Sequence, residues 1–300
     1  MTRRENRTLA APSGATAVRL VRSGGNGAAF HAVIGNCLAQ IGGNAAGIIV
    51  SQDSEYVHQM RVGLRRLRVA LGVFSALAPC PPALQREIDW LAGELGALRD
   101  WDVLTETTLP RLALLHPDEA GLESLRQAAA DSAAKRRHLL VDAVSSERYT
   151  RLLSMLKKWQ RGAPKRQAEV SLVHFAGDAL RCAYKKLQRR GKHLDDAAMR
   201  HRTRIAAKKM RYALEFFASL YPTGKVRRFV KILSRLQDVL GRLNDITVAD
   251  GLLRQLARRA PNAAGAGFAR GALASAAADD VARLDKRIKR LMQTRPPFDT

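Results

Sequence analysis

Two segments of this chain, 143 residues apart, carry the same pattern of basic and apolar side chains. The first, residues 57–71, reads VHQMRVGLRRLRVAL, and the second begins at Arg200. On a helix, basic residues at relative positions 0, 3, 7 and 10 fall within an arc of roughly 80°. Each segment therefore predicts a helix with one basic stripe, formed by His58, Arg61, Arg65 and Arg68 in the first segment and by His201, Arg204, Lys208 and Arg211 in the second.

An apolar row with the same spacing lies beside each stripe. Each helix can therefore bury its apolar side chains while it holds its cations at the edge of the contact. The row consists of Leu64, Leu67, Leu71 and Phe74 in the first segment and of Ala207, Met210, Leu214 and Phe217 in the second.

A second pair of segments matches further along the chain. LGALRDWDVL at 95–104 corresponds to LGRLNDITVA at 240–249, an offset of 145 residues. Two landmarks that recur in the same order indicate duplication of a whole helical unit. The chain is rich in Ala, Leu and Arg, only 5 % aromatic and without sustained period-two alternation, which predicts an all-α protein.

Glycine and proline clusters suggest the boundaries. We predict a disordered basic arm at 1–27, a first helical half at 28–160, a linker at 161–168, a second half at 169–293 and a tail at 294–300. Either Asp53 or Ser54 is expected to cap the first stripe helix, and either Asp195 or Asp196 the second. We call the matched segments 95–104 and 240–249 the LG-x-L segments. A helix junction is expected in each, which would place Asp100 and Asp245 near helix ends.

The charge of the chain favours a polyanionic partner. Lys and Arg number 51 against 27 Asp and Glu, which gives a formal net charge of +24. Such a field attracts nucleic acid, polyphosphate, anionic membranes or acidic proteins. Three widely spaced cysteines and the lack of a secretory signal predict a cytoplasmic protein. The apolar run at 45–50 is too short to span a bilayer, so no membrane partner is expected.

The residue types in the stripes suit phosphate. The guanidinium fork can meet two phosphate oxygens, and evenly repeated cations match a long polymer better than one small anion. A single charged stripe is most often a solvated face, but these stripes adjoin the apolar rows instead of opposing them. Weak nucleic-acid binding stays open, although the stripes lack aromatic residues for base stacking and no nucleic-acid motif is present.

A metal-dependent phosphoanhydride hydrolase is the enzymatic alternative. Its magnesium ligands would be Asp100, Asp102 and Asp245, but Asp102 becomes Thr247 in the second half, so no symmetric acidic pair survives. Capping or pairing with arginine is the preferred role of these acids. The histidines lack the partner spacing of a zinc helix. We expect no catalytic residue, no metal and no cofactor.

The His-headed stripes VHQMRVGLRRLR and MRHRTRIAAKKMRYALEFF, together with LGALRDWDV and LQDVLGRLND, resemble the CHAD family, the conserved histidine α-helical domain. The resemblance covers about 28–292. It implies two pseudo-symmetric four-helix bundles with a basic cavity or surface between them. It also implies non-enzymatic binding of inorganic polyphosphate, cytoplasmic association with polyphosphate granules and contact with granule-associated proteins.

By motif position, the resemblance assigns polyphosphate binding to His58, Arg61, Arg65, Arg66, Arg68, His201, Arg204, Lys208, Lys209 and Arg211. Arg66 and Lys209 point roughly 80° to 120° away from the stripe centres and are expected to serve another surface. Secondary basic candidates on other predicted helices are Arg151, Lys157, Arg227, Lys231 and Arg235.

Overall fold

The computed structural model describes residues 9–162, 170–258 and 262–299, and within these ranges the protein is all-α, as predicted, with no β-strand. The first half contains α1 (Asn26–Gly42), α2 (Ala45–Val50), α3 (Ser54–Val73), α4 (Pro82–Val103), the π-helical turn η1 (Leu104–Thr108), α5 (Leu109–Leu115), α6 (Gly121–Ser145) and α7 (Glu147–Gly162). The second half contains α8 (Leu172–Gly191), α9 (Ala197–Phe217), the 3-10 turn η2 (Ala218–Leu220), α10 (Thr223–Leu256) and α11 (Ala263–Met292).

Both stripe helices begin at the predicted aspartates. The Asp53 carboxylate accepts the backbone N–H of Glu55 at 2.8 Å, and the Asp196 carboxylate accepts that of Met199 at 2.7 Å. Each carboxylate satisfies one of the free N–H groups of a helical first turn. The caps fix where α3 and α9 start and therefore which side chains each helix turns inward.

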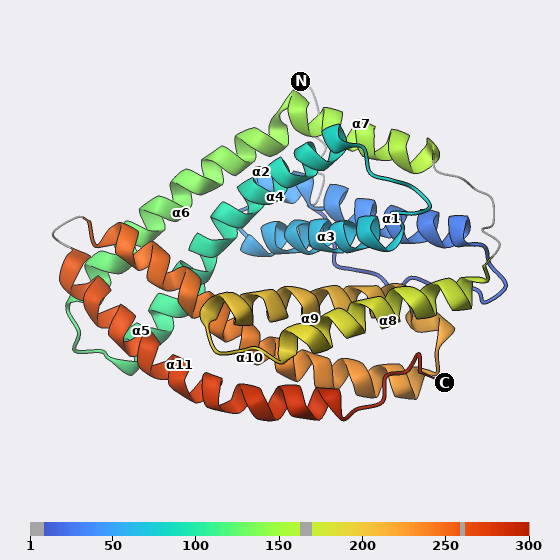
Figure 1. Ribbon diagram of the computed structural model, residues 1–300. Coiled ribbons are helices and arrows are strands. Elements are labelled where there is room, and N and C mark those ends of the chain that lie inside the picture. The colour runs from blue at the N-terminus through green and yellow to red at the C-terminus, as the bar shows by residue number, and fades with distance from the viewer. Residues whose placement is uncertain (1–8, 163–169, 259–261, 300) are drawn as a thin grey trace, which may run out of the picture.

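The stripe helices α3 and α9 lie side by side at the centre of the molecule (Figure 1). The rings of Phe74 and Phe217, which end the two apolar rows, have centroids 6.2 Å apart. Every residue of both predicted rows is buried. Arg61 likewise lies near Arg204 and Arg65 near Lys208, so the two helices run in the same direction and these equivalent side chains face one another.

One hydrophobic core crosses from the first half to the second. It joins Phe30 of α1, Leu67 of α3 and Leu91 of α4 to Leu180 of α8 and Phe216 of α9. A smaller core lies at the far end of the molecule, where α4, α5 and α6 meet α10 and α11. The expected halves at 28–160 and 169–293 are therefore consecutive along the chain but share one main core. Most of the expected linker at 161–168 lies outside the described residues.

The helix junction predicted at 240–249 is wrong, because Asp245 lies inside the uninterrupted α10. Gly241 is tolerated within this helix because α10 packs along much of its length on α9 and α11. The junction predicted at 95–104 is present, since α4 ends at Val103, three residues after Asp100, and η1 follows. Pro110 lacks an N–H and its ring crowds the carbonyl of Glu106, which accounts for the π-helical turn at 104–108.

Residues 9–25 do not form the disordered arm that their composition predicts. The Ala10 carbonyl accepts the Tyr56 hydroxyl at 2.8 Å, and the Leu20 N–H donates to the Ser219 hydroxyl at 2.9 Å. Val18 is buried against the shared core. This segment therefore ties the two halves together, while residues 1–8 of the predicted arm lie outside the described ranges. In the predicted tail, Phe298 is likewise buried, against Tyr184 and Phe229.

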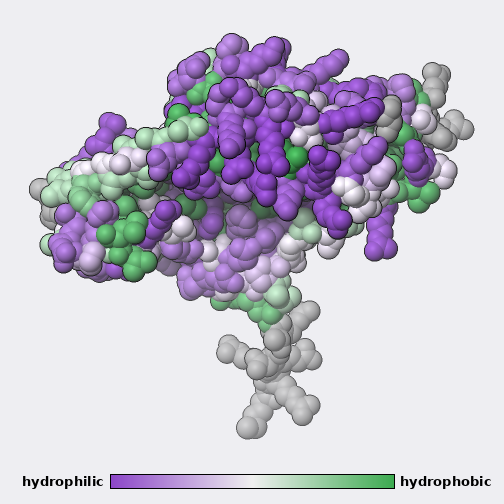
Figure 2. Space-filling view, turned by 90° about the horizontal axis from the view of Figure 1, so that it is seen from below, coloured by the Kyte–Doolittle hydropathy of each residue, from purple (hydrophilic) through white to green (hydrophobic). Residues whose placement is uncertain are grey.

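Residues 26–50, which span α1 and α2, have the length and hydropathy of a membrane-crossing helix, and no other described segment does. Phe30, Ile34 and Ile41 of this segment are fully buried in the shared core. Core helices of globular proteins meet the same criteria, and these contacts assign the segment to the core. Hydrophilic residues cover most of the face shown in Figure 2, and smaller hydrophobic areas lie scattered among them.

Gly265 is expected to be essential for the packing of α11 on α6. A Cβ atom at Gly265 would lie 2.1 Å from the carbonyl oxygen of Gly121, which is backbone and has no rotamer to change. We expect Gly265→Ala to lower the free energy of unfolding by about 1–3 kcal/mol, as overpacking does elsewhere. Thermal denaturation followed by circular dichroism measures the change.

Gly267→Ala is the matched control, since a Cβ at this position of α11 meets nothing within 4 Å. That substitution should leave the protein unchanged or stabilise it by up to about 1 kcal/mol through helix propensity. Equal effects of the two substitutions would contradict the close approach of α6 and α11.

Candidate functional site

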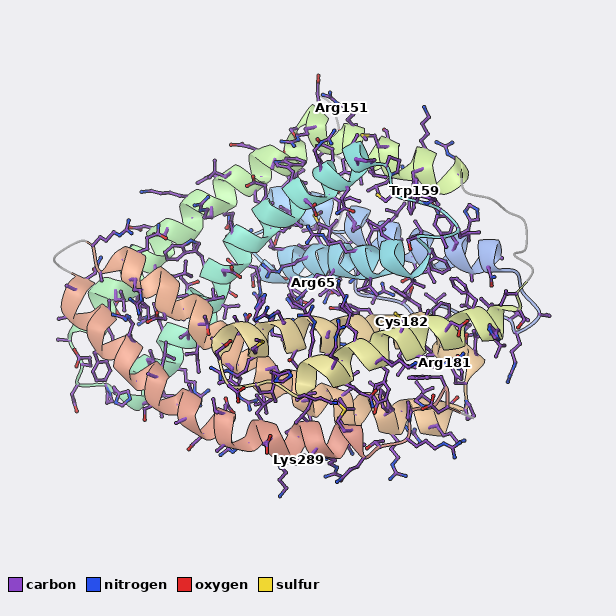
Figure 3. The ribbon with its side chains drawn as sticks, viewed as in Figure 1. Arg65, Arg151, Trp159, Arg181, Cys182 and Lys289 are labelled. Carbon is purple, nitrogen blue, oxygen red and sulfur yellow. The ribbon has the colours of Figure 1, made fainter. Side chains whose placement is uncertain are left out.

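Four cations from the two stripes meet where α3 and α9 face each other. We call Arg61, Arg65, Arg204 and Lys208 the basic cluster. All four side chains are partly buried. The four side chains lie close enough for their charges to interact. The charge of Arg204 acts on Arg61, and the charges of Arg65 and Arg204 act on Lys208. Figure 3 shows Arg65 in the space between the two helices.

Two aspartates from the repeated LG-x-L segments accompany the cluster. Arg61 Nη1 lies 3.5 Å from Asp100 Oδ1 and donates to the Gly96 carbonyl at 3.0 Å, while Arg204 Nη2 lies 3.9 Å from Asp245 Oδ1. The equivalent acids of the two halves thus pair with the equivalent arginines. This agrees with the predicted arginine pairing and excludes the capping role, since both acids lie within helices.

Several guanidinium donors of this region are buried without a hydrogen bond. In the described part of the chain, the Nε atoms of Arg65, Arg204 and Arg211 have no hydrogen-bond partner. Arg211 Nε lies 3.4 Å from a Glu215 carboxylate oxygen, in a geometry too poor for a hydrogen bond. A buried unpaired donor is costly, so the packing of the surrounding helices, and not hydrogen bonding, holds these guanidinium groups in place.

The pKa of Lys208 shows how strongly its surroundings disfavour one more positive charge in the cluster. Burial, followed by the charges of Arg65 and Arg204, lowers the pKa of this ammonium from 10.5 to about 6, although Asp245 opposes the shift. Burial also lowers the pKa of Arg61 and of Arg65. The cluster therefore holds more positive charge than its two aspartates neutralise, and an anion bound here would raise the pKa of Lys208.

The two histidines differ in their surroundings. Burial lowers the pKa of His58, with a further contribution from Arg99, so His58 is neutral at physiological pH. His201 is exposed, and its Nδ1 lies 2.8 Å from the side-chain oxygen of Asn244. This contact places a proton on Nδ1 and leaves Nε2 of the neutral ring as an acceptor.

Arg66 was assigned to the binding surface by its motif position, and the structure corrects this assignment. Arg66 is 2 % exposed, donates from Nη1 to Gln40 Oε1 at 2.9 Å and lies over the Phe216 ring at 5.5 Å from its centroid. The helix turns this side chain about 100° away from Arg65 and into the core. Arg66 therefore supports the packing of α3 and does not reach the cluster.

Arg68 and Lys209 lie outside the cluster, on the exposed surface. Arg68 pairs with Asp89 of α4. Lys209 lies near Lys186 and Arg190 of α8, and burial followed by these charges lowers its pKa. Lys209 was predicted to serve a surface other than the stripe, and its position beside α8 agrees with this prediction. Arg68 was predicted to act with the stripe, but it pairs with Asp89 outside the cluster.

The secondary candidates are spread over outer faces of the molecule. They are Arg151 and Lys157 on α7 and Arg227, Lys231 and Arg235 on α10, all exposed. Figure 3 shows Arg151 at the outer edge, away from Arg65. These residues add to the general field of the protein and do not belong to the cluster.

Arg99 is the residue of this region that the sequence analysis did not select. Its charge acts on His58, Arg61 and Arg65, so it lies at the His58 end of the cluster. The position of Arg99 in a repeated LG-x-L segment is the signal that could have identified it. The equivalent residue in the second half is Asn244, so a search for basic residues repeated in both halves does not find Arg99.

Asp102 is not part of the same acidic group as Asp100 and Asp245. It is 4 % exposed, and burial followed by the charge of Glu106 raises its pKa to about 6. Its other charged neighbours are Arg137 and Arg99. Within the described ranges, no three side chains of the types that bind metal ions are grouped together.

Comparisons with known proteins agree with this architecture. The chain is 44 % identical to the protein in the crystal structure of the CHAD domain from the plant Ricinus communis, with a TM-score of 0.88 over 96 % of this chain and 98 % of that one. PptA from Streptomyces chartreusis is 16 % identical, with a TM-score of 0.67 over 90 % of this chain and 99 % of that one, and shares the fold. A search of curated protein sequences gave no significant match.

The sequence profile of the CHAD domain matches residues 32–254, which is more than half of the chain. The matched region includes both stripe helices and both LG-x-L segments. Together with the Ricinus communis structure, this match shows that the chain belongs to the CHAD domain family.

Proposed function

We propose that this protein binds inorganic polyphosphate in the basic cluster between α3 and α9. The observation that carries the proposal is the group of four partly buried cations on two facing helices, whose charges act on one another. A phosphate chain offers several charged acceptors within a short length, so it can lower the repulsion among these cations.

Nucleic acid fits this surface less well than polyphosphate. None of the aromatic side chains in the described residues is exposed, so the protein offers no stacking platform for bases. DNA and RNA are therefore expected to bind only through general charge attraction, which salt weakens. Polyphosphate has no bases, so its affinity does not depend on stacking.

We propose binding without hydrolysis. The carboxylates of Asp100 and Asp245 are occupied by Arg61 and Arg204, and Asp102 faces Glu106 and Arg137 instead of the cluster. Asp100 and Asp245 also act on each other, but each has an arginine beside it, so we expect these two acids to balance charge in the cluster and not to bind a metal ion. A protein of this kind would act as a cytoplasmic binding module that attaches to polyphosphate granules, where it could meet other granule-associated proteins.

Reversal of charge in the cluster should remove polyphosphate binding. Arg65→Glu with Lys208→Glu deletes two charged contacts and adds two repulsive ones, and hydrogen bonds to charged groups contribute about 1.5–3 kcal/mol each. We therefore expect the Kd for long-chain polyphosphate to rise at least about 100-fold. Titration calorimetry at fixed ionic strength measures the change, and circular dichroism verifies that helicity is retained.

The matched control is Arg151→Glu with Lys231→Glu, which changes the net charge by the same amount on outer faces of α7 and α10. This variant should lose less than about tenfold in affinity, since it alters only screened, distant charge. Equal losses in the two variants would refute the cluster as the binding site. Release of phosphate from the polymer in the presence of Mg²⁺, abolished by Asp100→Asn or Asp245→Asn, would favour the hydrolase instead.

Polyphosphate binding should weaken as the pH rises above about 6. The pKa of Lys208 is about 6 in the free protein and is raised by the bound anion. Below pH 6 the free protein already carries this proton. Above it, binding must take up the proton, so the Kd rises with pH by up to about tenfold per unit until the pKa of the complex is reached. Calorimetry in buffers of different ionisation enthalpy detects this uptake directly.

Lys208→Arg should flatten this pH dependence, because a guanidinium stays protonated throughout the range. Lys231→Arg, on the exposed face of α10, is the matched control and should keep the slope. Long chains are the appropriate ligand, since they have few terminal phosphate groups that titrate near neutrality. An unchanged slope in Lys208→Arg would show that another group takes up the proton.

A further inference from the structure

A groove of about 650 Å³ opens beside the basic cluster, between the first two turns of α9 and the middle of α10. Its apolar surface is formed by Leu240, Leu243 and Val248 of α10 and by Ala197 and Ala198 of α9. This volume lies within the range of small-molecule sites, which are mostly apolar with a few placed polar groups.

The corresponding region of the first half carries polar and charged side chains. At the 143-residue offset, Ser54 and Glu55 stand where the second half has Ala197 and Ala198. At the 145-residue offset, Arg99 stands opposite Asn244 and Asp102 opposite Thr247. Four polar or charged positions of the first half therefore correspond to small or neutral side chains in the wall of the groove.

Helices α2 and α6 also cover the region in the first half. Ser54 donates to Glu106 at 2.7 Å, and Arg137 of α6 donates to the Ser51 carbonyl at 3.1 Å. The α2 helix packs on both α3 and α6. In the second half, the short segment 192–196 joins α8 directly to α9 with no counterpart of α2, so the groove remains open.

Polar groups connect the groove to the basic cluster. His201 Nδ1 and the Asn244 side-chain oxygen meet at 2.8 Å in its wall. Asn244 Nδ2 donates to Asp245 Oδ1 at 3.4 Å, and the same carboxylate oxygen lies 3.9 Å from Arg204. An apolar surface, the hydrogen-bonding pair of His201 and Asn244, and Arg204 of the basic cluster thus follow one another along about two turns of α9.

We propose that this groove binds the nucleoside end of a purine nucleoside di- or triphosphate whose phosphates extend to Arg204 and the basic cluster. The inference rests on the proposed function, since it uses the same cations for the phosphates. It adds a second class of ligand, an organic polyphosphate, to the inorganic polymer.

The chemistry of the groove selects this class of ligand. An inorganic phosphate chain would leave Leu240, Leu243 and Val248 exposed to water, and a purely apolar ligand would leave the cations unsatisfied. A purine has apolar faces for these side chains, and asparagine forms a matching pair of hydrogen bonds with the edge of adenine. Asn244 and His201 can exchange their mutual hydrogen bond for contacts with such an edge.

The test compares ATP with inorganic tripolyphosphate, both without Mg²⁺, by titration calorimetry on the full-length protein. Although ATP carries less charge, burial of its base should make its Kd at least about tenfold lower than that of tripolyphosphate. Ala198→Phe fills the groove and should raise the Kd of ATP to that of tripolyphosphate, while the Kd of tripolyphosphate changes less than about twofold. Ala134→Phe, at an exposed position of α6, is the matched control and should leave both values unchanged.

The outcomes separate this inference from the proposed function. If tripolyphosphate binds and wild-type ATP binds no more tightly, the groove does not take a nucleoside, while the basic cluster stands as a phosphate site. If neither ligand nor long-chain polyphosphate binds, the proposed function fails as well. Loss of ATP affinity in both Ala198→Phe and Ala134→Phe would also overturn the inference, because the effect would then not belong to the groove.

Discussion

The packing of α3 against α9 is the interaction on which both the fold and the candidate site depend. Burial of the two apolar rows, which meet at Phe74 and Phe217, draws the helices together. The basic stripes adjoin these rows, so the same packing forces Arg61 toward Arg204 and Arg65 toward Lys208. Hydrophobic burial, which scales with area, offsets a charge repulsion that the cluster does not relieve on its own.

A site built in this way couples ligand binding to stability. An anion bound in the cluster would raise the pKa of Lys208, and it would stabilise the folded chain increasingly as its concentration exceeds Kd. The segment 9–25 and the shared core hold both halves in place when no anion is bound. The fold can therefore keep the cations close together at the expense of some of its stability.

Repetition in the sequence predicted the elements that depend on local pattern. The caps at Asp53 and Asp196, the buried apolar rows and the facing stripes all follow from spacing along a helix. Features decided by tertiary packing were missed. The α10 helix continues past Gly241 because its neighbours support it, and Arg66 lies in the core because Gln40 and Phe216 receive its guanidinium group there. Residues 9–25, which have no regular helical pattern, are ordered by contacts with α3 and η2.

The two halves match at the centre of the candidate site and differ at its two ends. Positions that match, such as Arg61 with Arg204 and Asp100 with Asp245, build the common charged centre. At the positions that differ, the first half closes its end of the site with Ser54, Glu106 and α6. The second half has small or neutral residues at those positions and no counterpart of α2, so its end stays open. The candidate site is therefore symmetric in its central arginines and aspartates but differs in what surrounds them at its two ends.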